Sequence, residues 1–377
     1  MVTIDTATKT GIWIIATGVI IMALKLGQAI LAPFALAVFI YFVIEGLAQE
    51  IDERSETLKR GASRFISVFI ILIGFAGFIV MMARGISQFS SQATVYETKL
   101  NALSSDIYGL FGLADAPTVM SLFSGDAGGQ LVGVLSSAAA NLSESFVLVL
   151  IYVAFLYIAR PAWPKKLDAI FGEGENREAA REVGDDAKRG IEAYVWTQTV
   201  ISALITLLTY GTLIILGVNN ALFLAALIFV LNYIPTIGSI VAAFVPLLFA
   251  LVQPDAAWPA WMADNSYINA AIVFGAVSFW QFTIGNFLQP RMMGDSLNLS
   301  ALVVLLSLAI WGEIWGITGM FLSAPLTVIM MICFAQHKST RWLAILLSQN
   351  GNPEAAKQAE TEAPQEAETA VTQSGDD

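Results

Sequence analysis

The sequence predicts an all-α, polytopic membrane protein with about eight transmembrane helices, two of its segments being broken or re-entrant helical hairpins. Three observations predict this fold class. Hydrophobic residues make up 56% of the 377 residues and charged residues 13%, against roughly 45–50% and roughly 25% in soluble domains. Apolar runs of membrane-spanning length recur along the chain, and two late runs are interrupted by Gly, Pro and polar residues. The composition excludes a soluble enzyme, most nucleic-acid-binding proteins and a disordered chain.

The net charge of −11 is concentrated at the C-terminal end. Residues 350–377 hold seven acidic residues and one lysine, which supply −6, so the rest of the chain carries −5. We therefore expect 347–377 to be a disordered acidic tail. The remaining charge offers no basic patch for nucleic acid.

The chain lacks the residues that common catalytic and cofactor sites need. Cys333 is the only cysteine and His337 the only histidine, and no Gly-Lys dipeptide occurs. Disulfides, histidine-based metal sites and a phosphate-binding loop for ATP are therefore not expected. We predict a protein that is not an enzyme, binds no metal or cofactor, and draws on an ion or solute gradient.

The apolar runs divide the first half of the chain into spans and loops. The runs Gly11–Leu24 and Ala29–Ala48 predict a transmembrane hairpin within 1–48, with Lys25 reaching the membrane interface. Further along we expect a cytoplasmic loop at 49–64, a third span at 65–82, an extracytoplasmic helical region at 83–141, a fourth span at 142–158, a cytoplasmic loop at 159–193 and a transport core at 194–346.

The distribution of Lys and Arg predicts the orientation. The loop 49–64 has four and residues 159–193 have seven, whereas 83–141 has two and 253–266 has none. Because cytoplasmic loops are enriched in Lys and Arg, the first two segments and both termini are predicted inside, and the last two outside.

Two interrupted apolar segments lie in the predicted transport core, at 221–252 and 299–335. The first contains Asn232, Pro235, Gly238 and Pro246; the second contains Gly312, Glu313, Gly316, Gly319 and Pro325. Broken helices persist in a bilayer only where protein or a water-filled cavity surrounds them, and paired broken segments mark transporter binding sites. The alternative is that these residues only kink helices and allow them to pack closely.

Polar and small residues at the interruptions are the candidate substrate pathway. Gln281, Gly285 and Gln289 recur at steps of four, which predicts a polar stripe on one helix. Glu313 and Glu45 are candidate coupling groups, because carboxylates within apolar helices are costly. The alternatives are that Glu45 reaches the interface beside Glu50 and that Glu313 lies in water at the tip of a hairpin. The pathway candidates are Asn232, Pro235, Thr236, Gly238, Ser239, Gln281, Asn286, Gln289, Pro290, Gly312, Glu313, Gly316, Gly319, Ser323, Pro325 and Thr327.

Several of these motifs resemble the autoinducer-2 exporter family of bacterial permeases. The similar stretches are Leu231-Asn-Tyr-Ile-Pro-Thr-Ile-Gly-Ser239, Gln289-Pro-Arg-Met-Met-Gly294 and Leu302–Thr327, with the early Leu31-Ala-Pro-Phe34. The resemblance extends over residues 11–345. It implies a multi-pass inner-membrane permease that forms a homo-oligomer, with a pentamer suspected. Many members have Asp at the position of Asn232, and Glu313 stands where an apolar or aromatic residue is more usual.

The resemblance implies export of a small polar solute such as the quorum-sensing signal autoinducer-2. Because other members are reported as cation/proton antiporters, a sodium/proton antiporter using Glu313 or Glu45 is the second hypothesis. The third is a non-transporting membrane scaffold, with 83–141 and the acidic tail as partner surfaces.

Overall fold

The computed structural model describes residues 6–54, 60–110, 146–171, 175–254, 258–263, 265–293, 298–336 and 338–353. These residues form helices, with one isolated antiparallel bridge between Leu299 and Ser348. The helices are α1 (Thr6–Leu26), α2 (Gln28–Arg54), α3 (Arg60–Ser91), α4 (Ala93–Leu110), α7 (Trp163–Phe171), α8 (Glu175–Ile215), α9 (Ala221–Leu231), α10 (Ile237–Val252), α11 (Ser266–Thr283), α12 (Gln289–Met293), α13 (Ala301–Ala335) and α14 (Arg341–Leu347), with a 3₁₀ turn at Arg160–Ala162 and a π-helix at Ile284–Leu288.

Six helical segments among the described residues are long and apolar enough to cross a membrane. Large apolar side chains are exposed along them, for example Phe65 at 75% and Phe282 at 62%. The predicted class, a polytopic all-α membrane protein, is confirmed. The six segments are Gln28–Arg54, Gly61–Gln88, Phe146–Ile170, Lys188–Ile215, Ser266–Met292 and Ala301–Ala335, and shorter apolar helices are Gly11–Leu26, Ala221–Leu231 and Ile237–Val252.

The chain divides into two compact units, and α2 and α8 each contribute residues to both. Unit 1 comprises Met1–Val43, Phe146–Val195 and Asp295–Asp377, and unit 2 comprises Ile44–Ser145 and Trp196–Gly294.

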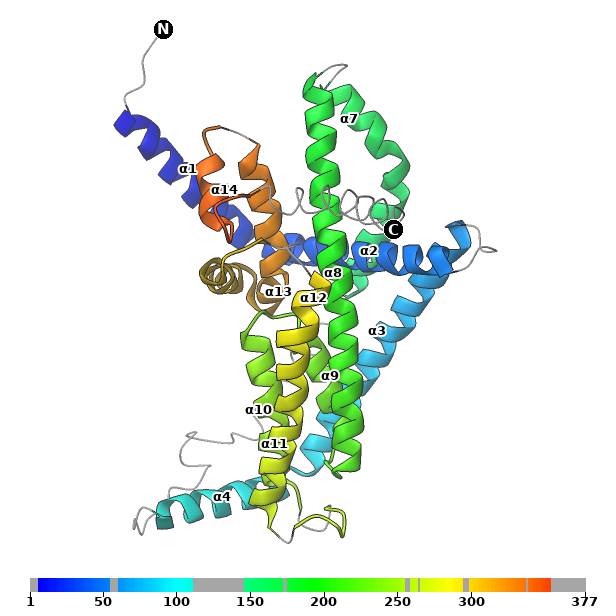
Figure 1. Ribbon diagram of the computed structural model, residues 1–377, viewed down its shortest axis with the longest axis vertical. Coiled ribbons are helices and arrows are strands. Elements are labelled where there is room, and N and C mark those ends of the chain that lie inside the picture. The colour runs from blue at the N-terminus through cyan, green and yellow to red at the C-terminus, as the bar shows by residue number, and fades with distance from the viewer. Residues whose placement is uncertain are drawn as a thin grey trace, which may run out of the picture. The chain divides into compact units, whose positions relative to one another are not determined.

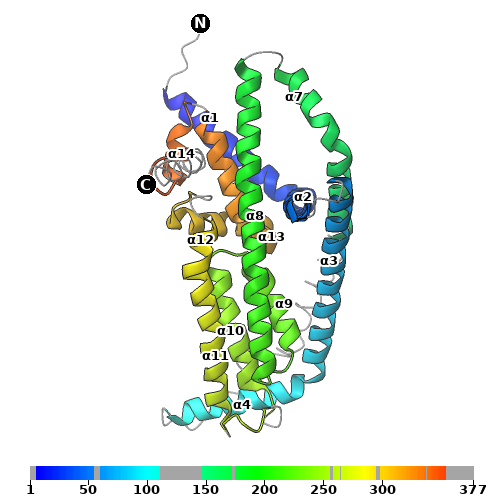
Figure 2. The same ribbon diagram turned by 45° about the vertical axis from the view of Figure 1, so that its right-hand side comes forward.

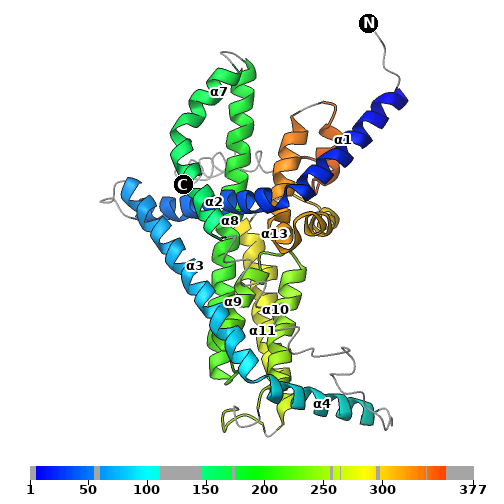
Figure 3. The same ribbon diagram turned by 180° about the vertical axis from the view of Figure 1, so that it is seen from behind.

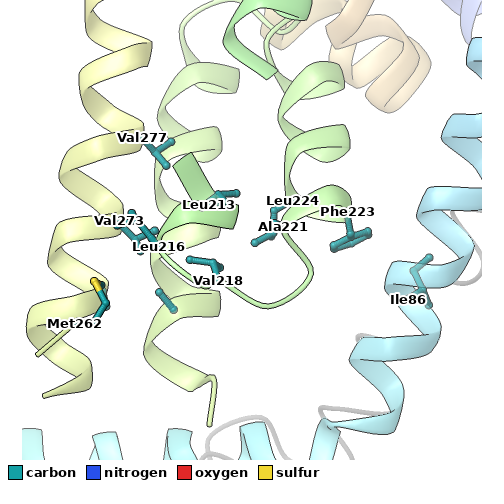
Figure 4. Close-up of a cluster of buried hydrophobic side chains, with 12 residues drawn as sticks. Ile86, Leu213, Leu216, Val218, Ala221, Phe223, Leu224, Met262, Val273 and Val277 are labelled. Atoms are coloured by element: carbon teal, nitrogen blue, oxygen red, sulfur yellow. The ribbon is translucent and has the colours of Figure 1, made fainter. Parts of the chain in front are cut away.

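Unit 2 is a helical bundle with α4 across one end. Figures 1 and 2 show α9, α10, α11 and the C-terminal part of α8 running side by side. Their apolar residues, including Leu213, Leu224 and Val273, form a core that is closed to solvent. Figure 4 shows this cluster, with Ile86 of α3 facing Phe223 of α9.

Unit 1 is built around α13. Its C-terminal part packs with α14 through a cluster that includes Leu299, Val328 and Met331. Trp311 and Trp315 of α13 pack with Ala32 of α2 in another cluster. The indole nitrogen of Trp315 donates a hydrogen bond to the carbonyl oxygen of Leu24 at 3.1 Å. α1 is therefore attached to the middle of α13.

The joint between α1 and α2 differs from the hairpin expected within residues 1–48. A single residue, Gly27, separates the two helices. Its amide bonds to the carbonyl oxygen of Ala23 at 2.8 Å, and its own carbonyl accepts from Leu31 at 2.9 Å. Reversing a helix takes a loop of about two to five residues. α1 therefore leads into α2 with a bend, which Figure 3 shows from behind, and the hairpin expectation is wrong.

Both segments expected to be broken are interrupted, but not at every residue named. α9 ends at Leu231 and α10 begins at Ile237, and the dihedral angles of α13 leave the helical region at Trp315 and Gly316. Pro246 lies inside α10 and Pro325 inside α13, so the helix continues through both prolines. Both segments are thus broken as predicted, but neither Pro246 nor Pro325 is where the helix ends, although an interior proline removes a backbone donor and crowds the preceding turn.

Several predicted boundaries differ from the helices or lie outside the described residues. α3 and the segment Phe146–Ile170 are longer than the spans predicted at 65–82 and 142–158. Residues 111–141 of the predicted extracytoplasmic region, 55–59 of the loop 49–64, and 354–377 of the acidic tail are outside the part of the chain that the structure describes.

Candidate functional site

The interruption between α9 and α10 is closed by its own backbone. Pro235 lacks an amide hydrogen, and Thr236, directly before α10, has a φ of 61°. Neither residue can continue a regular α-helix from α9 into α10. The amide of Gly238 donates to the carbonyl oxygen of Ile234 at 3.0 Å. A Cβ atom on Gly238 would collide with the carbonyl oxygen of Leu231, so only glycine fits there. Local hydrogen bonds thus satisfy the broken backbone, as an apolar surrounding requires.

Two glutamines bond to Asn232 at this interruption, and a third glutamine bonds to one of them. Gln198 of α8 donates from Nε2 to the backbone oxygen of Asn232 at 2.7 Å. Gln281 of α11 donates to the side-chain oxygen of Asn232 at 3.1 Å. Gln289 donates to the side-chain oxygen of Gln198 at 3.3 Å. The four residues form a connected group, which we call the amide cluster.

The amide cluster is uncharged and incompletely paired. Asn232 Nδ2 is buried and has no hydrogen-bond partner. Each of the four side chains carries both donors and acceptors and none titrates near neutral pH. Beside the cluster, the hydroxyl of Tyr233 donates to the hydroxyl oxygen of Thr199 at 2.8 Å. The arrangement suits a neutral solute with hydroxyl or carbonyl groups, since such a solute exchanges hydrogen bonds with amides without burying a charge.

The π-helix brings Gln281 and Gln289 to the same cluster. They are eight positions apart, whereas two turns of an α-helix take roughly 7.2 residues, so a regular helix would offset their side chains. The wider turns of Ile284–Leu288 reduce the angular offset between the two side chains. π-helical insertions of this kind are frequent at functional sites. The polar stripe predicted on this helix is thus built by an irregular turn.

Other candidates near the first interruption lie outside the amide cluster. Asn286 is exposed and donates to the carbonyl oxygen of Phe282 on its own helix at 2.9 Å. The hydroxyl of Ser239 donates to the carbonyl oxygen of Thr236 at 2.9 Å. Thr236 and Pro290 are exposed, and Pro235 is half-buried. Of the candidates in this unit, the structure therefore brings together Asn232, Gln281 and Gln289.

The interruption of α13 follows the same local pattern as that between α9 and α10. Gly316 has φ 61° and ψ −141°, a conformation that is essentially restricted to glycine. A Cβ atom on Gly319 would collide with the carbonyl oxygen of Trp311. At Gly312 a Cβ atom would lie 2.9 Å from the side chain of Met320. Small residues are required here for the chain to turn and continue.

The two candidate coupling carboxylates are both in ion pairs. Glu313 lies 2.5 Å from the ammonium group of Lys25 in α1, and both side chains are exposed. Glu45 lies 3.3 Å from the Arg64 guanidinium, and the Glu45 side chain is only 11% exposed. Each carboxylate therefore has a positively charged partner that balances its charge.

Ser323, Pro325 and Thr327 are buried inside the second part of α13. The hydroxyl of Ser323 donates to the carbonyl oxygen of Met320 at 2.8 Å, and that of Thr327 to the carbonyl oxygen of Ser323 at 2.7 Å. Both hydroxyls are satisfied within their own helix. Their contacts are those of packing residues.

Three residues of these sites were not among the candidates from the sequence. Gln198 bonds to Asn232, Lys25 pairs with Glu313, and Arg64 pairs with Glu45. Gln198 carried a usable signal, because it stands near the start of the apolar run Thr197–Leu216. The sequence predicts only an interfacial position for Lys25, since no sequence pattern connects it with a residue 288 positions later.

Comparisons with known proteins agree on one family. The model of the AI-2E family transporter matches residues 12–338. AI-2 transport protein TqsA of Escherichia coli is 28% identical over 334 residues, covering 88% of this chain and 92% of that protein. A putative transport protein of Haemophilus influenzae is 28% identical over 348 residues, covering 90% and 96%. Putative transport protein YhhT of Escherichia coli is 26% identical over 347 residues, covering 90% and 95%.

Proposed function

Because this chain belongs to the AI-2E transporter family, we propose that it exports a small polar solute such as autoinducer-2 across the bacterial inner membrane. The similarity to AI-2 transport protein TqsA of Escherichia coli supports this choice of solute. Export proceeds down a gradient or coupled to one, without ATP and without enzymatic chemistry on the solute.

The observation that carries the proposal is the amide cluster at the first interruption. Asn232 and Gln198 are held by hydrogen bonds within an otherwise apolar bundle, and Asn232 Nδ2 has a free hydrogen. A buried donor without a partner costs free energy that a solute oxygen recovers on binding. The cluster also offers Gln281 and Gln289 as further donors to hydroxyl or carbonyl oxygens of the solute.

The proposed role of the cluster is recognition of a neutral solute during passage. Each glutamine reaches the cluster from a different backbone segment: Gln198 from α8, Gln281 from α11, and Gln289 after the π-helix. A solute that replaces one amide–amide hydrogen bond leaves the other bonds in place. Binding is then reversible and weak enough for release, which transport requires.

Everted membrane vesicles test this proposal through two asparagine substitutions. Asn232→Leu keeps the approximate size of the side chain but removes the amide. We expect uptake of autoinducer-2 to fall about tenfold for each hydrogen bond to the solute that is lost, because about 1.4 kcal/mol corresponds to a factor of ten. Asn286→Leu is the matched control, because Asn286 bonds only within its own helix; its uptake should equal that of the unmodified protein.

Two results would contradict the proposal in different ways. Full uptake by folded Asn232→Leu protein would remove the amide cluster as the site. Vesicles with the unmodified protein that accumulate no more autoinducer-2 than vesicles without it would remove this solute as the cargo.

We further propose that the protein is a homo-oligomer and that its Lys- and Arg-rich loops and both termini lie in the cytoplasm. The counts of Lys and Arg in 49–64 and 159–193 support this orientation. The mass of the purified protein in detergent, corrected for bound detergent, tests the assembly: a single-chain mass of 40.6 kDa would contradict it.

A further inference from the structure

Buried polar atoms without a partner are confined to one unit. Among the described residues, every buried side-chain nitrogen or oxygen that lacks a hydrogen bond belongs to unit 2. Besides Asn232, these atoms include the hydroxyls of Thr206 and Thr209 and the amide nitrogen of Gln253. Leaving such groups unpaired in an apolar bundle is unfavourable, so their concentration calls for a common explanation.

Polar residues follow one face of α8 from the amide cluster. Gln198 donates to the hydroxyl of Ser202 at 3.4 Å. The next polar positions are Thr206 and Thr209, so the steps are four, four and three residues, the spacing of one helix face. Ser202 and Thr209 have no exposed surface. This line covers about 16 Å along the helix axis.

The hydroxyls of Thr206 and Thr209 are buried and have no hydrogen-bond partner. A threonine in a helix commonly bonds to the carbonyl oxygen four residues earlier, as Thr212 does to Leu208 at 2.8 Å on the same helix. Thr206 and Thr209 do not make such a bond. Both stand between apolar residues, Ile205 on one side and Leu213 on the other. Packing alone would favour valine at these positions.

Gln253 supplies a polar group at the far end of the bundle. It follows the last residue of α10, is 1% exposed, and accepts a hydrogen bond from the backbone amide of Asn219 at 3.0 Å. Its own amide nitrogen is unpaired. α10 has 16 residues, a length of about 24 Å. Asn232 caps α9 just before α10 begins and Gln253 follows the end of α10, so the two flank a helix somewhat shorter than the roughly 30 Å hydrocarbon core.

We propose that the polar face of α8 forms a hydrated route for a neutral, oxygen-bearing solute through unit 2 of a single chain, from the amide cluster to Gln253. This proposal rests on the proposed function and adds the route to it. Ser202, Thr206 and Thr209 each donate and accept, so a solute or water moves along the line by exchanging one hydrogen bond for the next.

Cysteine accessibility tests the route without any transported solute. Cys333 is the only cysteine, so Cys333→Ala gives a background for single cysteines. A charged methanethiosulfonate reagent needs water to reach the thiol, and a thiol buried in apolar surroundings forms little of the reactive thiolate. We expect Thr206→Cys and Thr209→Cys in folded protein to react about tenfold faster than two controls. The controls are Ile205→Cys, 3% exposed beside the route, and Leu207→Cys, 67% exposed on the other face.

Equal reaction rates at all four positions would overturn the route. Modification of both threonine positions without any autoinducer-2 uptake by the unmodified protein would support the route and remove the proposed cargo. Autoinducer-2 uptake without modification at Thr206 or Thr209 would support the cargo and overturn the route.

Valine substitutions provide a second measurement that does not rely on a reagent. Thr209→Val removes the unpaired hydroxyl and keeps the shape, so a purely structural threonine predicts equal or higher thermal stability with unchanged uptake. The route predicts equal or higher stability with uptake reduced severalfold, and Thr209→Ser, which retains the hydroxyl, should restore uptake. Unchanged uptake in Thr209→Val and Thr206→Val would overturn the proposal.

Discussion

Lys25 and Glu313 illustrate what a single pair of residues does in an apolar unit. They join α1 to α13 two residues before the interruption at Trp315, and Trp315 bonds to the carbonyl oxygen of Leu24 beside them. An ionised side chain within a membrane-spanning helix is costly unless it is paired. The pair therefore makes each charge tolerable and attaches α1 at this point.

A double-substitution cycle tests that pairing. We expect Lys25→Met alone to leave Glu313 unpaired and Glu313→Met alone to leave Lys25 unpaired, so each lowers the yield of folded protein in the membrane. The double variant should regain much of the yield, because no charge is left without a partner. Fluorescence-detected size-exclusion chromatography measures the folded fraction. Losses that simply add in the double variant would show that the two residues act independently.

Gly238 tests the local closure of the first interruption. A Cβ atom there would collide with the carbonyl oxygen of Leu231, so we expect Gly238→Ala to lower the free energy of unfolding by about 1–3 kcal/mol. Gly275→Ala in α11 is the control, because a Cβ atom there meets nothing within 4 Å. It should be neutral or stabilising by up to about 1 kcal/mol. Thermal melting in detergent compares the two, and equal melting temperatures would contradict the steric argument.

At the scale of elements, α4 is held to the bundle by a tyrosine. Tyr96 is 3% exposed, its ring lies 6.3 Å from that of Phe249 in α10, and its hydroxyl donates to Gln92 at 2.7 Å. Burial raises the pKa of Tyr96 above its ordinary value of 10.0, and the neighbouring Asn220 side chain partly opposes this. The docked helix therefore favours the neutral phenol.

The raised pKa of Tyr96 predicts how stability depends on pH. The stabilising contribution is fully present below the unfolded-state pKa of about 10 and falls as the pH rises toward the folded-state pKa, since the unfolded chain loses its phenol proton first. Melting temperatures between pH 8 and pH 11 should therefore decline more steeply for the unmodified protein than for Tyr96→Phe. Parallel declines would contradict the assignment.

The two interruptions were predictable in position because their causes are local. Asn232, Pro235 and Gly238 stand together within 221–252, as Gly312, Gly316 and Gly319 do within 299–335, and the chain breaks within both groups. Pro246 and Pro325, in the same two segments, lie inside helices that continue past them, so a proline alone does not mark the break. The sequence pattern also missed the joint at Gly27, where two apolar runs that suggest a hairpin are joined by one residue.

The candidate sites were less predictable because they depend on residues far apart in the sequence. The pairing of Gln198 with Asn232 spans 34 positions and that of Gln198 with Gln289 spans 91. Sequence spacing could place Gln281 and Gln289 on one stripe, but the π-helix that brings them to one cluster has no spacing signal. Asn286, between them, is exposed and lies outside the cluster.

For the whole molecule, the distribution of Lys and Arg among the loops predicts the orientation in the membrane. Thr94 of α4 and Glu178 of α8 are both exposed, and the proposed orientation puts them on opposite sides of the membrane. In the Cys333→Ala background, an impermeant maleimide should label Thr94→Cys but not Glu178→Cys in intact spheroplasts. Both should be labelled after permeabilisation, and labelling of Glu178→Cys but not Thr94→Cys in intact spheroplasts would invert the orientation.

The neutrality of the amide cluster has an electrical consequence. Asn232, Gln198, Gln281 and Gln289 carry no formal charge. A membrane potential of 100 mV changes the energy of one elementary charge crossing the bilayer by about 2.3 kcal/mol, and it does no work on a neutral solute. Uncoupled passage of such a solute past this cluster therefore generates no current, and its rate should be the same in polarised and depolarised membranes.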